Sequence, residues 1–360
     1  MPGSPIEPPA YWDRFLGDGG GLYNDGTASV SNSTFTGNSA LFGHGGGLFN
    51  INPLIGVGTV SVSNSTFTSN SAAIAGGGLA NYGTATASVS GSTFTSNSAI
   101  LAGGGLANEE GGTASVVGTT FTRNSARSGG GLDNGAGVSV SNSTFTSNSA
   151  TGLPATGLGG GGLANFGTAI VDGSTFAGNS AIGPGGGVLN APGGTLARLT
   201  NCTVRDNSAL AGGGISNQGT LNVIFSRILN NTATTKGGGI STTDSSAAVI
   251  IDSVINTNQV ISSATALGGG IDCENSFLSL FDCAVNANQA NGTTALGGGI
   301  YALESMATVQ DSTVNGNRAN GAVLGQGGGI YRSGGDLTLV DSLVKGNKAT
   351  TAFDNIFPPL

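Results

Sequence analysis

The stretch GGGLANYGTATASVSGSTFTSN, residues 76–97, recurs in similar form along the whole chain and decides the fold. Its first block, three glycines and an aliphatic residue, occurs twelve times at spacings of 25–31 residues. Self-similarity at such a period is typical of solenoids, in which each repeat is one structural unit stacked on the next. The repeat therefore predicts a single elongated domain of about twelve coils.

A second block, an apolar residue followed two positions later by Asn, appears in every repeat as FTSN, FTRN or a variant such as VNGN. In stacked coils these asparagines form a buried column, in which each side-chain amide bonds the next copy. We predict a structural ladder rather than a ligand site. Its members are Asn38, Asn70, Asn97, Asn124, Asn148, Asn179, Asn207, Asn231, Asn258, Asn288, Asn317 and Asn347.

The apolar residues of each repeat alternate with polar ones, as in Ser29-Val30-Ser31 and Thr34-Phe35-Thr36. A period of two indicates strands, and no window has the spacing of an amphipathic helix. Asn, Gly or Asp stands between the second and third anchors in all repeats but one, which has Phe225, and these residue types tolerate a left-handed bend. The prediction is an all-β parallel β-helix with three short strands per coil.

The combination of GGG-[LIV] with F-x-x-N resembles the GGA-[ILV] and F-x-x-N repeats of chlamydial polymorphic outer-membrane proteins. More broadly, it resembles pectin-lyase-like right-handed β-helix repeat proteins of bacterial surfaces, over residues 19 to about 350. The resemblance implies a right-handed solenoid, an extracellular or cell-surface location and an adhesin-like role. The implied partners are glycans or proteins of a host, matrix or cell surface.

Composition excludes several partners. The 360 residues include 67 glycines, 8% are charged, and the net charge is -8. Nucleic acids and anionic membranes need clustered Lys and Arg, which the chain lacks. No apolar run reaches the roughly 20 residues that span a bilayer, and the start shows no basic and apolar segments of a signal peptide. We expect no membrane insertion and no export signal in this chain.

The ends of the repeat array differ from its body. Residues 1–18 and 351–360 are non-repetitive and contain aromatic residues, including Trp12 and Phe353. We interpret them as caps around a solenoid at residues 19–350, because open strand edges invite stacking. The alternative is end-to-end association into a filament. Cys273 and Cys283 fall in one coil, and the sequence leaves their pairing open.

Threonines flank the inward Phe in the first five repeats and form a T-x-T array. Because neighbouring side chains of a strand point to opposite faces, both threonines point outward. The array resembles the ranked threonines of insect antifreeze β-helices, which implies ice binding, whereas exposed Thr is also an ordinary strand residue. The array consists of Thr34, Thr36, Thr66, Thr68, Thr93, Thr95, Thr120, Thr122, Thr144 and Thr146.

A column of aspartates occupies the bend position of the last four repeats: Asp252, Asp282, Asp311 and Asp341. Carboxylates at coil spacing repel one another unless water or a cation separates them, and carboxylate oxygens are suitable ligands for Ca²⁺. They are the candidate metal ligands, with solvated bend residues as the alternative. We expect no other cofactor.

Catalytic groups do not converge in the sequence. Acids outside the bend column are scattered, and the basic candidates nearest the column, Arg318 and Lys345, lie in loop positions beside the asparagine ladder. We therefore expect no catalytic residues and a non-catalytic scaffold or adhesin-like protein. The alternatives are a carbohydrate-active pectin-lyase-like enzyme, an ice-binding protein and a filament subunit.

Overall fold

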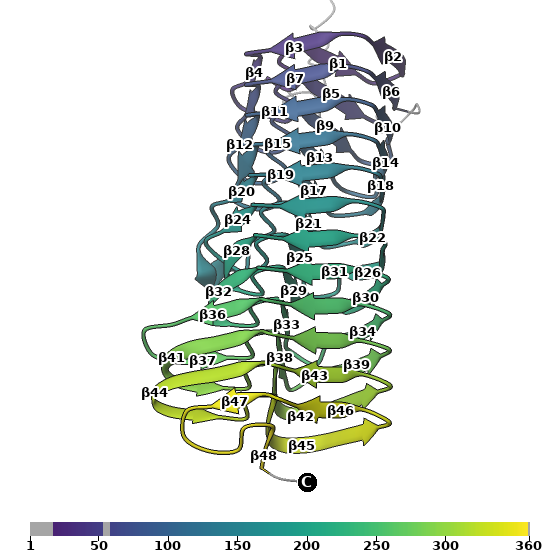
Figure 1. Cartoon of the computed structure of the whole chain (residues 1–360). Helices are drawn as coiled ribbons and strands as arrows, with labels where there is room; N and C mark the ends of the chain where they lie inside the picture. Colours follow the sequence, from purple (N-terminus) through teal and green to yellow (C-terminus); the bar gives the residue numbers. More distant parts are fainter. Residues whose placement is uncertain (1–16, 53–57, 359–360) are drawn as a thin grey trace, which may run out of the picture.

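The computed structural model describes residues 17–52 and 58–358, which wind into a stack of parallel coils (Figure 1). The strands form three sheets, here called sheets A, B and C, with 23, 12 and 13 strands. Every strand pairs in parallel with its copy in the neighbouring coil. The predicted all-β parallel solenoid is confirmed, and the twelve strands of sheet B correspond to the twelve repeats.

One coil shows how the repeat folds. Sheet A takes β9 (Leu79–Tyr82) and β10 (Thr86–Ser90), sheet B takes β11 (Thr93–Thr95), and sheet C takes β12 (Ser98–Ala99). The three predicted strands are present. The fourth, in sheet C, is only two residues long here, too short to produce a periodic signal in the sequence.

Sheet B is the most regular of the three because each of its strands has three residues. Its strands are β3 (Thr34–Thr36), β7 (Thr66–Thr68), β11, β15 (Thr120–Thr122), β19 (Thr144–Thr146), β23 (Thr175–Ala177), β27 (Thr203–Arg205), β31 (Arg227–Leu229), β35 (Val254–Asn256), β40 (Ala284–Asn286), β43 (Thr313–Asn315) and β46 (Leu343–Lys345).

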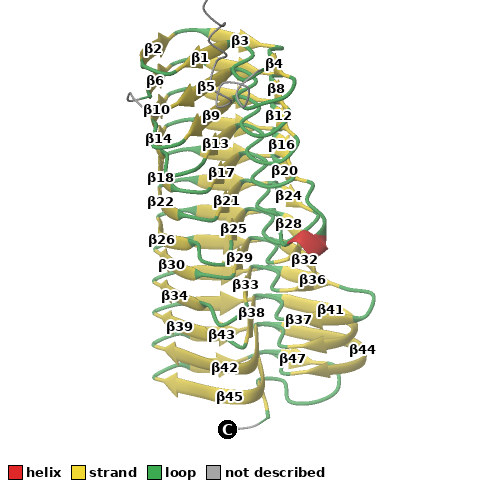
Figure 2. Cartoon of the chain, turned by 180° about the vertical axis from the view of Figure 1, so that it is seen from behind, coloured by secondary structure: helices red, strands yellow, loops and turns green. Residues whose placement is uncertain are grey.

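The C-terminal coils are broader. In sheet A, the two strands of a coil fuse into β42 (Ile300–Gln310) and β45 (Ile330–Val340). In sheet C, β41 (Gln289–Leu296) and β44 (Arg318–Gln326) project beyond the stack (Figure 2). A 3-10 helix, η2 (Pro154–Thr156), interrupts an earlier loop on the same side. The longest strands of sheet C and the η2 loop therefore lie on the same side of the stack.

The core is a set of vertical columns. Six phenylalanines, from Phe35 to Phe176, stack with ring centroids 4.6–4.9 Å apart. Offset or parallel ring stacking adds roughly 0.5–1.5 kcal/mol per pair beyond the burial of area. From Val204 onward, smaller aliphatic residues continue the same column.

The triple glycine is required by close contact and by backbone conformation. Gly76 has a φ of +66°, which side chains disfavour. A Cβ on Gly77 would lie 2.3 Å from the carbonyl oxygen of Ser98 in the next coil. No other residue type fits there, which explains why the block recurs without substitution.

The asparagines of the second block form a continuous hydrogen-bonded column. Asn97 donates from its backbone N and its Nδ2 to Oδ1 of Asn124, at 2.9 and 3.0 Å, and its Nδ2 also donates to the carbonyl of Phe67. The same contacts link the asparagines from Asn70 to Asn347, where Asn355 accepts from the last member. The column therefore satisfies buried backbone groups in each coil.

Each bend between sheets A and B has a left-handed residue, with φ between +45° and +55°. Phe225 adopts this conformation at +48° although its side chain is bulky. Such a residue costs roughly 1–2 kcal/mol relative to Gly or Asn. The regularity of the bend therefore overrides the preference of one side chain.

The proposed N-terminal cap falls almost wholly outside the described residues. At the other end, β48 (Ile356–Phe357) pairs with the start of β45. Cys202, Cys273 and Cys283 are buried free thiols, so Cys273 and Cys283 are not bonded. Within residues 17–52 and 58–358, no helix has the length and apolar character needed to cross a bilayer.

Candidate functional site

A polar pocket lies on the outer surface of sheet A, between the loops that leave sheet C and the turns that follow the first strand of each coil. Its volume is about 280 Å³, near the lower end of small-ligand sites, at roughly 300 Å³. It is lined by Pro154, Gly157, Pro184, Leu210, Ala211, Ser216, Gln218, Lys236, Ser241, Thr243, Asp244, Glu274 and Asn275.

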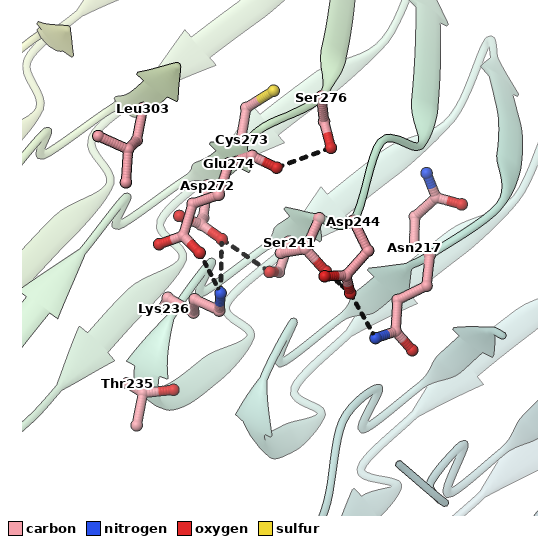
Figure 3. Close-up of polar contacts among 12 residues, drawn as sticks. Asn217, Thr235, Lys236, Ser241, Asp244, Asp272, Cys273, Glu274, Ser276 and Leu303 are labelled. Atoms are coloured by element: carbon pink, nitrogen blue, oxygen red, sulfur yellow. Dashed lines mark hydrogen bonds and ion pairs between the residues drawn. The ribbon is translucent and has the colours of Figure 1, made fainter. Parts of the chain in front are cut away.

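Three charged side chains meet at this pocket (Figure 3). Lys236 Nζ lies 2.5 Å from Oε2 of Glu274 and 3.9 Å from Oδ2 of Asp272. Lys236 ends β32 (Thr232–Lys236), on the loop side, whereas both acids belong to β38 (Ile271–Glu274), on the floor and turn side. The parallel register of neighbouring coils brings Lys236 close to Asp272 and Glu274, which follow it by 36 and 38 residues.

Strand alternation places these acids on the outer face. Ile271 and Cys273 point into the core, so Asp272 and Glu274 point outward. Asp272 is nevertheless fully buried, because the neighbouring coils and loops cover the centre of the strand. Its Oδ2 accepts a 2.8 Å hydrogen bond from Ser241 Oγ, and its Oδ1 has no partner among the described residues. The carboxyl thus forms the floor beneath Ser241.

Burial and neighbouring charges shift the pKa values of Asp272 and Lys236. Burial, followed by the charge of Glu274, raises the pKa of Asp272 to about 8, although Lys236 and Ser241 oppose the shift. Burial lowers the pKa of Lys236, but Asp272 and Glu274 together raise it above its ordinary value. Burial thus favours the protonated form of Asp272, which lies beside the ion pair of Lys236 and Glu274.

The turn side of the pocket is fixed by further hydrogen bonds. Gln218 Nε2 and Thr243 Oγ1 each donate to Oδ2 of Asp244 at 2.9 Å. Asp244 has a φ of +65° and is exposed. Gln218 Oε1 is buried at the pocket with no partner among the described residues. The pocket thus offers one acceptor and one acid besides the charged cluster.

The predicted site residues lie elsewhere on the molecule. The threonine array lies on the outer face of sheet B, and each Thr is in register with a Thr of a neighbouring coil. The column from Asp252 to Asp341 occupies exposed bends between sheets A and B. No group of three or more Asp, Glu, His or Cys side chains arranged to hold a metal ion occurs within the described ranges. Ice and calcium binding both remain predictions.

A second buried carboxyl occupies the position of Asp272 five coils earlier. Asp133 is the central residue of β17 (Leu132–Asn134) and is 4% exposed. Burial raises its pKa to about 7; Ser128 lowers it in part, and Glu109 raises it further. Unlike Asp272, it has no lysine beside it.

Replacing Asp133 with Asn is expected to stabilise the protein above about pH 7. Between about pH 4 and pH 7, folded Asp133 keeps a proton that the unfolded chain releases, so its contribution to stability falls as pH rises through this window. A shift of about three units corresponds to about 4 kcal/mol. Urea unfolding of D133N should show this gain at pH 8 and almost none at pH 4. The exposed D282N variant is the control, and an equal gain in it would contradict the assignment.

Comparison with known proteins places the fold. The model of the right-handed β-helix region matches residues 131–328, which are more than half of the chain and include Lys236, Asp272 and Glu274. The chain belongs to the right-handed β-helix family. No curated protein matches it in sequence. The likeness to chlamydial repeats remains a prediction, because the matched model describes right-handed β-helices in general.

Three solved structures resemble this β-helix. The A-module of mannuronan C-5 epimerase AlgE4 from Azotobacter vinelandii has a TM-score of 0.52 and 10% identity, covering 93% of this chain and 91% of that one. The periplasmic alginate epimerase AlgG has a TM-score of 0.39 and 10% identity, covering 91% of this chain and 79% of that one. The Streptococcus pneumoniae surface protein and adhesin PfbA has a TM-score of 0.30 and 11% identity, covering 88% of this chain and 89% of that one. At these identities the first likeness establishes the fold alone.

The expectation of a non-catalytic protein is wrong. An enzyme, the AlgE4 A-module, shares the fold of this β-helix over nearly its whole length. The statement that acids and bases do not converge also fails, because Lys236, Asp272 and Glu274 meet in one pocket. One signal in the sequence could have found them. Asp272 follows the aliphatic residue of a glycine block, a position where only Asp133 among the other repeats has an acid, and Lys236 directly precedes such a block.

Proposed function

We propose that this β-helix is a polysaccharide-modifying enzyme that moves a proton at the carbon beside the carboxylate of a uronic acid unit. The observation that carries the proposal is the ion pair of Lys236 and Glu274 in a pocket beside the buried carboxyl of Asp272. A cation that holds the substrate carboxylate and a carboxylate that takes the proton are groups that such a transfer uses.

Lys236 is the group that would bind the substrate carboxylate. It contributes the only ammonium or guanidinium to the pocket lining, and its side chain is 26% exposed. An incoming carboxylate competes with Glu274 for this cation, and a carboxylate that loses its cation becomes a stronger base. Substrate binding would thereby release Glu274 to take the proton.

The geometry favours proton transfer over hydrolysis. Glycoside hydrolysis uses two carboxyl groups that flank the scissile bond. Here the two acids that line the pocket, Glu274 and Asp244, both come from the turn side, and Asp272 is buried beneath Ser241. No lining acid comes from the loop side, where Lys236 lies. A bond held in the pocket would therefore have acids on one side only.

Mannuronan is the first substrate to test, since it is a uronic acid polymer and AlgE4, an enzyme with this fold, is a mannuronan epimerase. An extended polysaccharide also agrees with an extracellular or cell-surface location, as the repeats suggest. The experiment incubates the protein with mannuronan in deuterated water and follows the proton beside the carboxylate by NMR. Incorporation of deuterium supports the proposal. New reducing ends without deuterium would instead indicate hydrolysis, and binding without either change would indicate a glycan-binding protein.

Replacing Lys236 with Met is expected to weaken mannuronan binding about 10- to 100-fold, because hydrogen bonds to charged groups contribute roughly 1.5–3 kcal/mol. The change should appear mainly in KM, measured by the same exchange assay. The exposed K348M variant is the matched control because it removes the same charge from the far end of the solenoid. An equal loss in K348M would show that only overall charge matters and would contradict the role of Lys236.

A further inference from the structure

Aromatic side chains continue the floor of the pocket toward the C-terminal end. The residues in register with Asp272 in the next three coils toward the C-terminus are Tyr301, Tyr331 and Phe357, one per coil. Ring centroids are 5.4 Å apart for the two tyrosines and 5.1 Å for Tyr331 and Phe357, with interplanar angles of 12° and 14°. At about 4.8 Å per coil, this aromatic column extends roughly 15 Å beyond Asp272.

The two tyrosine hydroxyls have no hydrogen-bond partner among the described residues. Tyr331 is half-buried and Tyr301 is 6% exposed, and neither hydroxyl is fully enclosed without a partner. Burial, followed by Glu274 and Asp272, raises the pKa of Tyr301 to about 12, so its hydroxyl stays protonated. The column thus presents two aligned donors that begin directly beside the acid cluster.

The column is specific to this end of the pocket. On the N-terminal side the same strand position has the small residues Ser241 and Ser216, followed by Leu189 and Ala164. Along the solenoid axis, Leu267, Leu296 and Gln326 continue the line of Lys236 on the loop side. Next to Asp272, aromatic side chains therefore extend the floor only toward the C-terminal end.

We propose that the aromatic column binds the units of a polysaccharide chain that neighbour the unit in the pocket. The hydroxyls of Tyr301 and Tyr331 donate to sugar oxygens, and the stacked rings hold both hydroxyls in a line along the solenoid axis. The chain then lies parallel to the axis, and the enzyme acts on internal units of long polymers. This inference rests on the proposed function, since the pocket sets where the chain begins.

The test uses Glu274→Gln as a background that binds without turnover. Mannuronan disaccharide and octasaccharide are titrated by calorimetry into this background and into its combinations with Tyr331→Ala and Tyr331→Phe. Loss of the Tyr331 side chain should weaken octasaccharide binding about 3- to 10-fold, the scale of one aromatic or hydrogen-bonded contact, and leave the disaccharide unchanged. Tyr331→Phe should lose part of the same affinity because only the donor is gone.

Tyr23→Ala is the matched control, because Tyr23 has the same strand position in the first coil, far from the pocket. Octasaccharide affinity equal in the Tyr331→Ala and Tyr23→Ala variants would overturn the inference, and so would an equal loss for both oligosaccharides. If wild-type protein also exchanges deuterium in those cases, the proposed function stands without the column. Wild-type protein that neither binds nor exchanges would overturn both.

Discussion

Replacing Glu274 with Gln is expected to slow deuterium exchange on mannuronan about 10²- to 10⁴-fold, the usual contribution of a general base. Glutamine keeps the size of the side chain and can still accept a hydrogen bond from Lys236, but it cannot take a proton. The loss should therefore appear in kcat rather than in KM. NMR exchange rates measured at several mannuronan concentrations separate the two parameters.

Glu304→Gln is the matched control for this variant. Glu304 is an exposed glutamate after the corresponding strand position of the next coil and does not line the pocket. It should retain wild-type exchange. An E274Q protein with unchanged kcat, or an E304Q protein with the same loss, would contradict the assignment of Glu274 as the base. Asp272→Asn adds a second check, because a floor that is already protonated should tolerate the amide better than Glu274 does.

The repeats made the fold predictable because the same physical constraint acts twelve times. Gly77 has no room for a Cβ, Phe94 stacks between two rings, and Asn97 bonds both neighbouring coils. Each residue is therefore visible as a period in the sequence. The fourth strand, such as Ser98–Ala99, could not be predicted because two small residues are too few to show the apolar-polar alternation of a strand.

The pocket could not be predicted in the same way because its residues break the repeat instead of following it. Lys occurs only once at the position of Lys236, and Glu274 shares its position with Glu109 alone. The long connection between β32 and β38 makes the separation of Lys236 from Glu274 unlike the other spacings. Only the register of β33 (Ile240–Thr242) with β38 brings them together. The features that do repeat, the threonines and the bend aspartates, predict sites on faces of the solenoid away from the pocket.

Replacing Asn124 with Ala is expected to lower the free energy of unfolding by about 3 to 5 kcal/mol. Asn124 is fully buried in the middle of the ladder. Its Oδ1 accepts from the backbone N and Nδ2 of Asn97, and its Nδ2 donates to the carbonyl of Phe94 at 2.9 Å. Alanine leaves these groups without their partner inside the solenoid, and each buried unsatisfied group costs roughly 1–3 kcal/mol. Urea unfolding followed by circular dichroism measures the loss.

Asn38→Ala provides the comparison that separates ladder position from residue type. Asn38 begins the same ladder, is only half-buried, and donates to Asn70 Oδ1 at 2.9 Å, while no described residue donates to its own side chain. Its loss should cost about 1 kcal/mol. Because each coil of a solenoid contacts only its neighbours, Asn124→Ala should also speed amide exchange mainly in the adjoining coils, at the backbone N of Asn97 above all. Equal destabilisation by the two variants would mean that the ladder gains nothing from continuity, and the asparagines would then act as separate local bonds.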